Sequence, residues 1–339
     1  MKVLYVGVIH PGWVNTTWMR QRVLEELGHE IHPLCLSPFL RWGGRYGGAI
    51  FRRYQWGIPL ALANRAILSA AKAFRPDLLW IDKGAWVTKA TLRRVKKLCG
   101  AHLLHYTPDP FFLFHRSRHF VSAVPAYDAL VTSKRYEAET YRSHGAQRLI
   151  VTKVAFDTEY HRPIELSRQE RLEYGCEAVF IGSYGEGRER YLKPLVAERV
   201  SLSVWGENWT ARCPDPEVLA AHRGRSLVGL DYAKGLAGAK IGLGLLSPLV
   251  PDRSTTRSVE IPACGVFLLA ERTDEHQELF EEGEEAEFFD GSEELLDKVR
   301  YFLAHDSARE RIAAAGRRRC LESGYSYRDQ IAGIIEMLP

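Results

Sequence analysis

The sequence of 339 residues predicts an α/β protein with two doubly wound parallel-sheet domains. Short apolar runs recur along both halves of the chain, and helix-length amphipathic segments separate them. The pattern is interrupted once, by a highly charged stretch at 165–173. The composition agrees with this prediction, because 46% hydrophobic and 26% charged residues are typical of globular domains.

The first domain is expected over residues 1–160. It begins with the apolar run 3–9, which fits a buried strand. After a Pro-Gly loop, a helix is expected to begin near Asn15 or Thr16 and to end at Gly28. Further apolar runs predict buried strands at 31–36, 78–81, 103–106 and 129–132.

The second domain is expected over residues 161–324, and it repeats the same alternation. Its apolar runs predict strands at 178–182, 202–206, 241–245 and 266–269. The chain closes with a short apolar helix, and we expect residues 325–339 to pack back toward the first domain. Two such Rossmann-like domains would face each other across a cleft, where ligands bind at the carboxyl ends of the strands.

Charge and cysteine content argue against several classes of protein. A net charge of +4 is too small to indicate a nucleic-acid-binding protein. No apolar run approaches the ~18 residues that span a bilayer. The six cysteines are scattered without a C-x-x-C pair, which is typical of reduced thiols. We expect a cytoplasmic protein, either free or peripheral at the inner face of the membrane.

One segment of the first domain is strongly basic. Residues 31–76 contain seven arginine and lysine residues and no acidic residue, and aromatic residues and glycines alternate with the arginines over 39–57. The segment is either a solvated loop, or a surface for an anionic or lipid-linked acceptor or an anionic membrane. We expect the acceptor to contact Arg41 and Arg45 of this segment, and Gly12 and Trp13 of the loop after the first strand.

The common cofactor motifs are missing. The sequence contains no G-x-G-x-x-G between a strand and a helix, no G-x-x-x-x-G-K-[ST], no H-E-x-x-H and no G-x-S-x-G. It also lacks an Asp-x-Asp pair, which could hold a divalent metal against a diphosphate. We therefore expect no cofactor and no metal, and we expect the protein itself to hold any diphosphate.

The most informative segment is 251–269, which fits a loop, a short helix and a strand. Hydroxyl residues preferred at a helix N-cap precede the helix: Ser254, Thr255 and Thr256. The free N–H groups of the first helical turn would form an anion site with Arg253 and Arg257, which suits a nucleoside diphosphate. Glu260 lies about a turn beyond and could accept hydrogen bonds from ribose hydroxyls. Alternatively, Arg257 and Glu260 form an i,i+3 ion pair on a surface helix.

The same segment resembles the C-terminal domain of CgeB-like glycosyltransferases. The resemblance rests on R-x-x-E-I-P-A-C-G-x-F-L-L at 257–269 and continues in order to the Tyr-Ser-Tyr-Arg turn at 325–328. The wider class has the GT-B fold of two Rossmann-like domains.

The resemblance implies roles for individual residues. In the related family 4 glycosyltransferases, two glutamates eight positions apart contact the donor. Glu260 resembles the second, at the ribose, while the first position, near the sugar, holds Asp252. Arg188 or Arg190 resembles the basic clamp on the diphosphate. A weaker likeness adds loop residues to the donor site: Gly182, Ser183, Tyr184, Glu207 and Asn208.

A catalytic base is expected from the loops of the first domain. Asp109 follows a buried strand directly, and His10 follows the first strand. In an inverting enzyme either group would deprotonate the acceptor hydroxyl, whereas in a retaining enzyme the leaving diphosphate takes that proton. Asp109, flanked by two prolines, also fits an ordinary turn.

The leading prediction is a metal-independent glycosyltransferase of the hexosyltransferase type, active in glycan biosynthesis. It would move a sugar from a nucleoside-diphosphate sugar, its co-substrate, to a hydroxyl of a glycan, a lipid-linked or a small-molecule acceptor. One alternative is a sugar-nucleotide epimerase of the same fold. The other is a non-catalytic binding partner on a GT-B-like scaffold.

Overall fold

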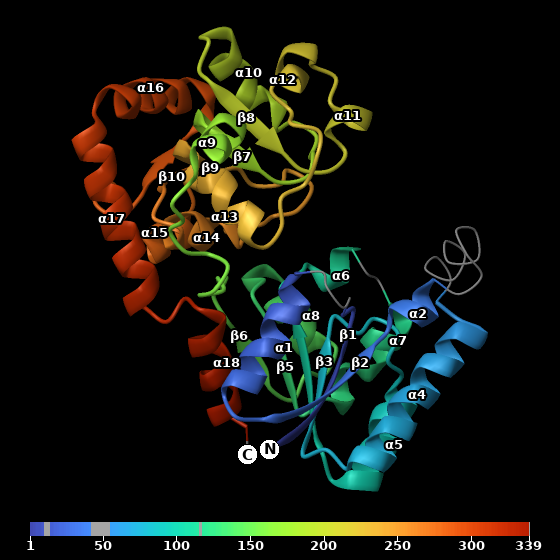
Figure 1. Cartoon of the computed structure of the whole chain (residues 1–339). Helices are drawn as coiled ribbons and strands as arrows, with labels where there is room; N and C mark the ends of the chain where they lie inside the picture. Colours follow the sequence, from blue (N-terminus) through green and yellow to red (C-terminus); the bar gives the residue numbers. More distant parts are fainter. Residues whose placement is uncertain (10–13, 42–54, 115–116, 339) are drawn as a thin grey trace. The chain divides into compact units, whose positions relative to one another are not determined.

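The chain forms two compact units (Figure 1). The computed structural model describes residues 1–9, 14–41, 55–114 and 117–338. The first unit comprises Met1–Lys153 with Arg328–Pro339, and the second comprises Val154–Tyr327. Each unit has its own parallel sheet, which confirms the predicted α/β class. Along the chain, the two units meet at 153/154 and at 327/328. The domain boundaries that we expect at residues 160 and 324 remain predictions.

The sheet of the first unit has six parallel strands in the order β2-β1-β3-β4-β5-β6. They are β1 (Lys2–Gly7), β2 (Glu30–Cys35), β3 (Leu78–Asp82), β4 (His102–Thr107), β5 (Ala129–Thr132) and β6 (Leu149–Val151). The central strands are buried along their whole length because helices cover both faces of the sheet.

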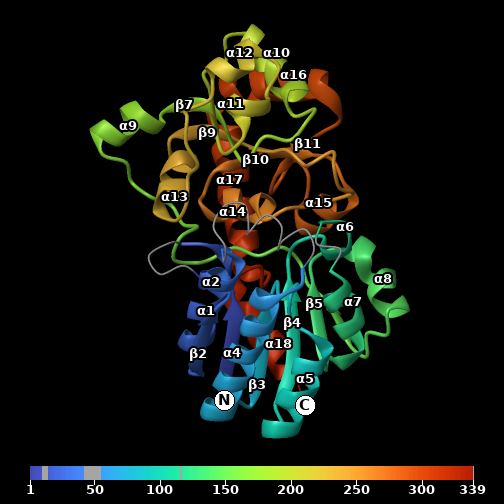
Figure 2. The same ribbon diagram turned by 90° about the vertical axis from the view of Figure 1, so that its right-hand side faces the viewer.

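Helices α4 and α5 cover one face of this sheet, and α1 and α18 cover the other (Figures 1 and 2). Their bounds are α1 (Thr16–Glu26), α4 (Ile58–Phe74), α5 (Lys89–Cys99) and α18 (Tyr327–Glu336). Shorter helices complete the unit: α2 (Ser37–Leu40), α6 (Phe111–Phe114), α7 (Arg118–Ala123) and α8 (Ala138–Ser143). Helix α1 begins as predicted, because the side chain of Asn15 accepts a hydrogen bond from the Trp18 N–H.

A buried ion pair joins α1 to the middle of this sheet. Asp82, at the end of β3, accepts hydrogen bonds from Arg20 Nε at 2.7 Å and Nη2 at 2.9 Å. It also accepts from the Tyr5 hydroxyl at 2.8 Å and from Thr17 Oγ1 at 3.0 Å. Burial would raise the pKa of Asp82, but the Arg20 guanidinium outweighs burial and lowers that pKa below its ordinary value.

The sheet of the second unit has five parallel strands in the order β11-β10-β9-β7-β8. They are β7 (Cys176–Ile181), β8 (Leu202–Trp205), β9 (Ala239–Gly244), β10 (Phe267–Glu271) and β11 (Glu287–Phe289). Two cores lie on its opposite faces, one under α13 and α14 and one under α10, α12 and α16. Their bounds are α10 (Glu189–Ala197), α12 (Pro216–Ala220), α13 (Leu230–Ala237), α14 (Arg257–Ala263) and α16 (Gly291–Ala304). The other helices are α9 (Arg168–Tyr174), α11 (Trp209–Arg212), α15 (Asp274–Leu279) and α17 (Asp306–Glu322).

Gly242 lets α14 approach the sheet closely. A Cβ atom at this position of β9 would lie 2.6 Å from Ile261 Cγ2 of α14, closer than two carbon atoms can approach. The glycine in this apolar run therefore serves helix packing.

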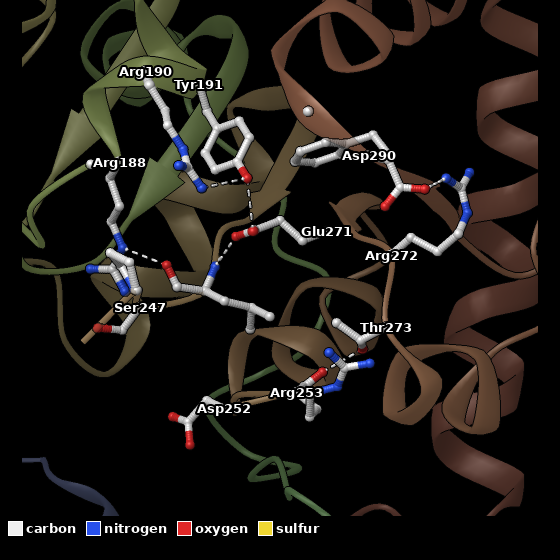
Figure 3. Close-up of a pocket in the computed structure, with 15 residues that line it drawn as sticks. Arg188, Arg190, Tyr191, Ser247, Asp252, Arg253, Glu271, Arg272, Thr273 and Asp290 are labelled. Carbon is white, nitrogen blue, oxygen red and sulfur yellow. Dashed lines mark hydrogen bonds and ion pairs between the residues drawn. The ribbon is translucent and has the colours of Figure 1, made fainter. Parts of the chain in front are cut away.

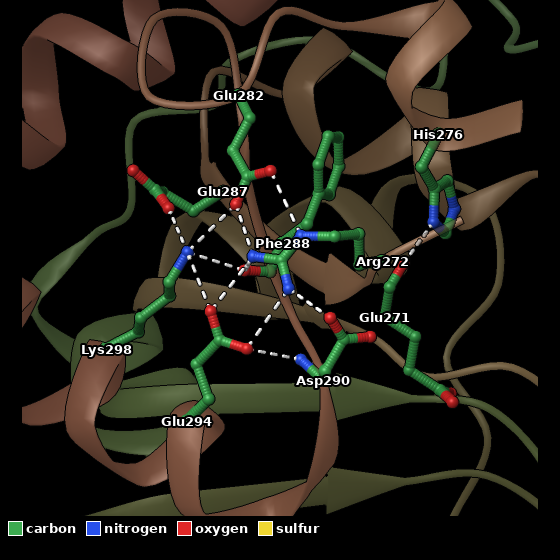
Figure 4. Close-up of polar contacts among 9 residues, drawn as sticks. All are labelled: Glu271, Arg272, His276, Glu282, Glu287, Phe288, Asp290, Glu294 and Lys298. Carbon is green, nitrogen blue, oxygen red and sulfur yellow. Dashed lines mark hydrogen bonds and ion pairs between the residues drawn. The ribbon is translucent and has the colours of Figure 1, made fainter. Parts of the chain in front are cut away.

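A cluster of charged side chains fastens the end of β10 to β11 and α16 (Figure 4). Arg272 donates to Glu282 at 2.6 Å, to Glu294 at 2.9 Å and to the Phe288 carbonyl at 3.0 Å. Lys298 of α16 donates to Glu287 at 2.6 Å. The hydrogen bonds from Arg272 lower the pKa of Glu294 to about 2.

Over the described ranges, none of the helices combines the length and the hydrophobicity that crossing a membrane requires.

We expect Asp82→Asn to destabilise the first unit by about 3–5 kcal/mol at neutral pH, because Arg20 would keep its buried charge without a carboxylate. The pKa of Asp82 is lower in the folded protein than its ordinary value. The stabilisation by the ion pair is therefore complete at pH values above the ordinary pKa, and it is lost as the pH falls through the pKa of the folded protein. Urea unfolding at several pH values measures both effects. The control is Glu139→Gln, in an exposed i,i+3 pair with Arg142, which should cost less than about 0.5 kcal/mol. An Asp82→Asn protein as stable as the wild type would contradict this account.

Candidate active site

Two arginine side chains each lie close to the ring of Phe180, near the end of β7. The Cζ atoms of Arg188 and Arg257 lie 5.3 and 5.4 Å from the ring centroid. Arg188 is buried and directly precedes α10, whereas Arg257 is the first residue of α14. Burial, and then the charge of Arg257, lower the pKa of Arg188 to about 10, which leaves the Arg188 guanidinium charged at neutral pH. Two guanidiniums near the same aromatic ring favour the binding of an anion.

Backbone carbonyls fix both guanidiniums in place. Arg188 Nε donates to the Leu246 carbonyl at 3.1 Å, and its Nη1 donates to the Ser183 carbonyl. Arg257 Nη2 donates to the Leu245 carbonyl at 2.9 Å. Within the described residues, the buried Nε atom of Arg257 has no hydrogen-bond partner. Each arginine is thus oriented before any ligand binds.

Gly182 leaves the space that this arrangement needs. A Cβ atom on Gly182 would lie 2.9 Å from Phe180 Cζ and 3.1 Å from Arg257 Nη1. Neighbouring loop residues join β7 to β8, because the Tyr184 N–H donates to the Glu207 carbonyl at 2.7 Å. The side chains of Glu207 and Asn208 are exposed. The structure thus brings the predicted loop residues together at one edge of the sheet.

The first turn of α14 differs from the sequence-based expectation. The N-cap residue Thr256 makes no side-chain capping bond. The N–H groups of Ser258 and Val259 already donate to the carbonyls of Thr255 and Thr256, at 2.9 and 3.0 Å. The prediction that the free N–H groups of this turn bind the anion is therefore wrong for these two groups, because the turn is tightened by i→i+3 bonds. The arginine side chains supply the positive charge instead.

A buried histidine connects α14 to the end of β10. Ser258 Oγ lies 2.7 Å from His276 Nε2, and His276 Nδ1 lies 2.6 Å from the Glu271 carbonyl. Burial lowers the pKa of His276 to about 4, so the ring is neutral and donates from Nδ1 to the carbonyl. Ser254, the other buried hydroxyl before α14, donates to Glu275 at 2.5 Å. These contacts hold α14 against α15.

Glu260 is buried in the body of the second unit. Its Oε2 atom accepts a hydrogen bond from the Tyr232 hydroxyl at 2.9 Å. Its Oε1 atom lies 3.8 Å from His161 Nε2, and His161 Nδ1 accepts the Asp157 N–H at 2.9 Å. The alternative ion pair with Arg257 is not formed, since Arg257 makes no salt bridge among the described residues. Tyr232 thus fixes the carboxylate through Oε2. The other oxygen, Oε1, has His161 near it, but at a distance too long for a hydrogen bond.

A cavity of about 250 Å³ lies at the ends of β9, β10 and β11 (Figure 3). Arg188 lines it together with the predicted donor residues Asp252 and Arg253. Arg253 itself is paired with Asp274 at 2.7 Å. Along one wall, Arg190 donates to the Tyr191 hydroxyl, which donates to Glu271, both at 3.0 Å. Of the two clamp candidates, Arg188 shares the Phe180 ring with Arg257, and Arg190 lies on this wall.

The predicted residues of the first unit are only partly described. Asp109 follows β4, and its carboxylate pairs with Lys83 Nζ at 2.7 Å. Arg41 is exposed at the end of α2. The four other predicted residues lie outside the described residues: His10, Gly12, Trp13 and Arg45.

Sequence reasoning missed several of these side chains. Phe180, Tyr232, His161, His276 and Lys83 come from distant segments, and no local motif marks them. Lys83 could have been found, because it follows β3 as Asp109 follows β4, and neighbouring parallel strands end at the same edge. Over the described part of the chain, no three or more His, Cys, Asp or Glu side chains gather in a way that could hold a metal ion.

One family model matches part of the chain. Residues 188–336 match the model of a family described as glycosyl transferase-like, and this range includes both Arg188 and Arg257. No curated protein matches the sequence significantly.

Several solved structures are similar over nearly the whole chain. HepE from Anabaena, in complex with UDP-glucose, has a TM-score of 0.66 at 12% identity and 100% coverage of both chains. Sucrose-phosphate synthase from Thermosynechococcus elongatus has a TM-score of 0.63 at 11% identity, with 99% of this chain and 98% of that chain covered. A candidate UDP-N-acetylglucosamine 2-epimerase from Listeria monocytogenes has a TM-score of 0.56 at 12% identity, with 98% and 94% covered. Identities this low establish the fold alone. The chain therefore has the GT-B fold, and its residues 188–336 are similar to the glycosyl transferase-like family.

Proposed function

We propose that this protein is a glycosyltransferase that moves a sugar from a nucleoside-diphosphate sugar to an acceptor hydroxyl. The observation that carries the proposal is the pair of guanidiniums of Arg188 and Arg257 above Phe180, within the glycosyl transferase-like domain. A diphosphate beside both arginines would accept charge-assisted hydrogen bonds from planar donors. HepE, a structural neighbour, was solved with UDP-glucose, which supports a nucleotide sugar as the donor.

The pair also supports transfer without a bound metal. When the bond between the sugar and the diphosphate breaks, negative charge develops on the departing phosphate oxygens. Cations that are already fixed in place stabilise this charge without reorganising at the moment of reaction. Arg188 and Arg257 meet this requirement because backbone carbonyls orient both of them.

Glu260 is proposed to hold the ribose. Tyr232 donates to Oε2, while His161 Nε2 lies 3.8 Å from Oε1, beyond hydrogen-bond distance. A ribose hydroxyl could therefore donate to Oε1 without displacing Tyr232. Asp252, on the wall of the cavity, is proposed to contact the donor sugar.

Asp109 is proposed as the base if the reaction inverts configuration. Lys83 holds the carboxylate at 2.7 Å, which orients it at the carboxyl end of β4. A base at this position would take the proton of the acceptor hydroxyl as the hydroxyl attacks the sugar. In a retaining reaction the leaving diphosphate accepts that proton, and Asp109 is not required.

An epimerase is the competing enzyme class, because a candidate epimerase shares the fold. It would release an isomerised sugar nucleotide and need no acceptor. A non-catalytic binding partner would bind the nucleotide sugar and leave it unchanged.

We expect Arg257→Ala to weaken the binding of a nucleoside diphosphate by about 1.5–3 kcal/mol and to leave nucleoside binding nearly unchanged. Only the diphosphate presents anionic oxygens to the guanidinium. Calorimetric titration of UDP, GDP and dTDP, each against its nucleoside, measures the difference. Arg318→Ala, which removes an exposed arginine of α17, is the control and should behave like the wild type. If Arg257→Ala lowers the affinity for the nucleoside as much as the affinity for the diphosphate, then Arg257 does not bind the diphosphate.

We expect Glu260→Gln to lower the affinity for the nucleoside as well as for the diphosphate, by about 1.5–3 kcal/mol, because a charged acceptor is replaced by a neutral one. Tyr232→Phe is the matched control, since it removes the internal hydrogen bond and keeps the carboxylate. Both variants are titrated after urea unfolding has shown that they are folded. If Tyr232→Phe weakens nucleoside binding as much as Glu260→Gln, then Glu260 acts on the fold and not on the ribose.

A further inference from the structure

A groove of about 600 Å³ lies between α4 and α5 in the first unit. Residues of α4 form one side, and residues of α5 form the other. The side chains that matter are the cations Arg65, Lys72, Arg94 and Lys97 and the leucines Leu68 and Leu98. None of these residues takes part in the candidate active site.

The groove carries positive charge that no carboxylate neutralises. Among the described residues, none of its four cations forms an ion pair. The two helices and the segment between them, 58–99, contain only two acidic residues, Asp77 and Asp82. Asp82 is buried against Arg20, and Asp77 accepts the backbone N–H of Lys2. The electrostatic potential of this face therefore favours an anionic partner.

Apolar side chains accompany these cations. Leu98, on the side formed by α5, is 40% exposed, and Leu68 is partly buried. Farther along α4, Leu62 is 40% exposed and Ile58 is 59% exposed. Leucines among long basic side chains suit a lipid interface, where the aliphatic stems contact the apolar layer and the charged ends reach the phosphates. A nucleic acid would use the cations and leave the leucines without a role.

The two helices hold this groove in a fixed shape. Each buries an apolar stripe against the sheet, with Ile67 and Ala71 on α4 and Leu92 and Val95 on α5. Between them, Cys99 Sγ donates to the Ala71 carbonyl at 3.5 Å. Arg75, just after α4, donates to the Leu98 carbonyl at 2.6 Å. The cations therefore need no rearrangement of the backbone to meet a flat anionic surface.

We propose that the groove between α4 and α5 docks the protein on a membrane of anionic phospholipids. Its four cations contact the lipid phosphates, and Leu98 contacts the apolar edge of the headgroup layer. This role is independent of the donor site, since every residue of the groove lies in the first unit and the arginine pair lies in the second. The docking site differs from the predicted surface at 39–57, most of which lies outside the described residues.

The test is co-sedimentation of the full-length protein with phosphatidylcholine vesicles that contain or lack phosphatidylglycerol. We expect binding only to the anionic vesicles, and weaker binding as salt rises. Each neutralised cation should weaken binding on the order of fivefold, so replacing Arg65, Lys72, Arg94 and Lys97 together by serine should abolish it. The matched control replaces four exposed arginines of the second unit by serine: Arg168, Arg171, Arg311 and Arg318. Equal loss in both variants, or binding that survives in the groove variant, would overturn the proposal.

A second variant separates a membrane from other anions. Leu98→Ser keeps all four charges, so it should weaken vesicle binding and leave any binding to double-stranded DNA unchanged. Wild-type protein that binds DNA but not anionic vesicles would show a nucleic-acid surface and overturn the proposal. Urea unfolding of the groove variant shows whether its first unit is folded. Nucleoside diphosphate titration separates the two proposals, because donor binding should be retained whether or not the membrane is bound.

Discussion

Two like charges held over one aromatic ring constrain the rest of the second unit. Arg188 and Arg257 repel each other, and an arrangement of this kind persists only when the surroundings compensate for the repulsion. The face of Phe180 and the carbonyls of Ser183, Leu245 and Leu246 provide that compensation. The carbonyls and the ring carry no full negative charge, so the two guanidiniums leave the end of β7 positively charged. A bound diphosphate would neutralise this charge.

The contacts around the arginines serve to position α14. Gly242 lets the helix approach β9, and the Ser258–His276–Glu271 chain fastens its first turn to the end of β10. The Arg272 cluster then fixes the segments that follow β10 and β11. Because α14 carries both Arg257 and Glu260, these distant contacts determine where a diphosphate and a ribose could bind. The site is therefore a property of the whole sheet edge and not of one motif.

Much of the fold could be predicted, because buried parallel strands appear as apolar runs between helical segments. The strands at 149–151 and 287–289 were missed, since three residues are too few to show a pattern. At the site, Arg257 was recognised from its segment, whereas its contact with Phe180 joins residues far apart in the sequence. The tight first turn of α14 could not be foreseen either, because hydroxyl residues before a helix usually cap it, and here Ser254 donates to Glu275 and Thr256 makes no capping bond.

The central claim is that the arginine pair serves sugar transfer. The most direct measurement is incubation of the protein with UDP-, GDP- and dTDP-sugars in the absence of an acceptor, followed by chromatography of the products. A transferase with its donor site intact transfers the sugar slowly to water, so one nucleotide sugar should yield free sugar and nucleoside diphosphate. Replacing Arg257 should suppress this hydrolysis. An isomerised sugar nucleotide, or tight binding with no turnover of any donor, would contradict the account.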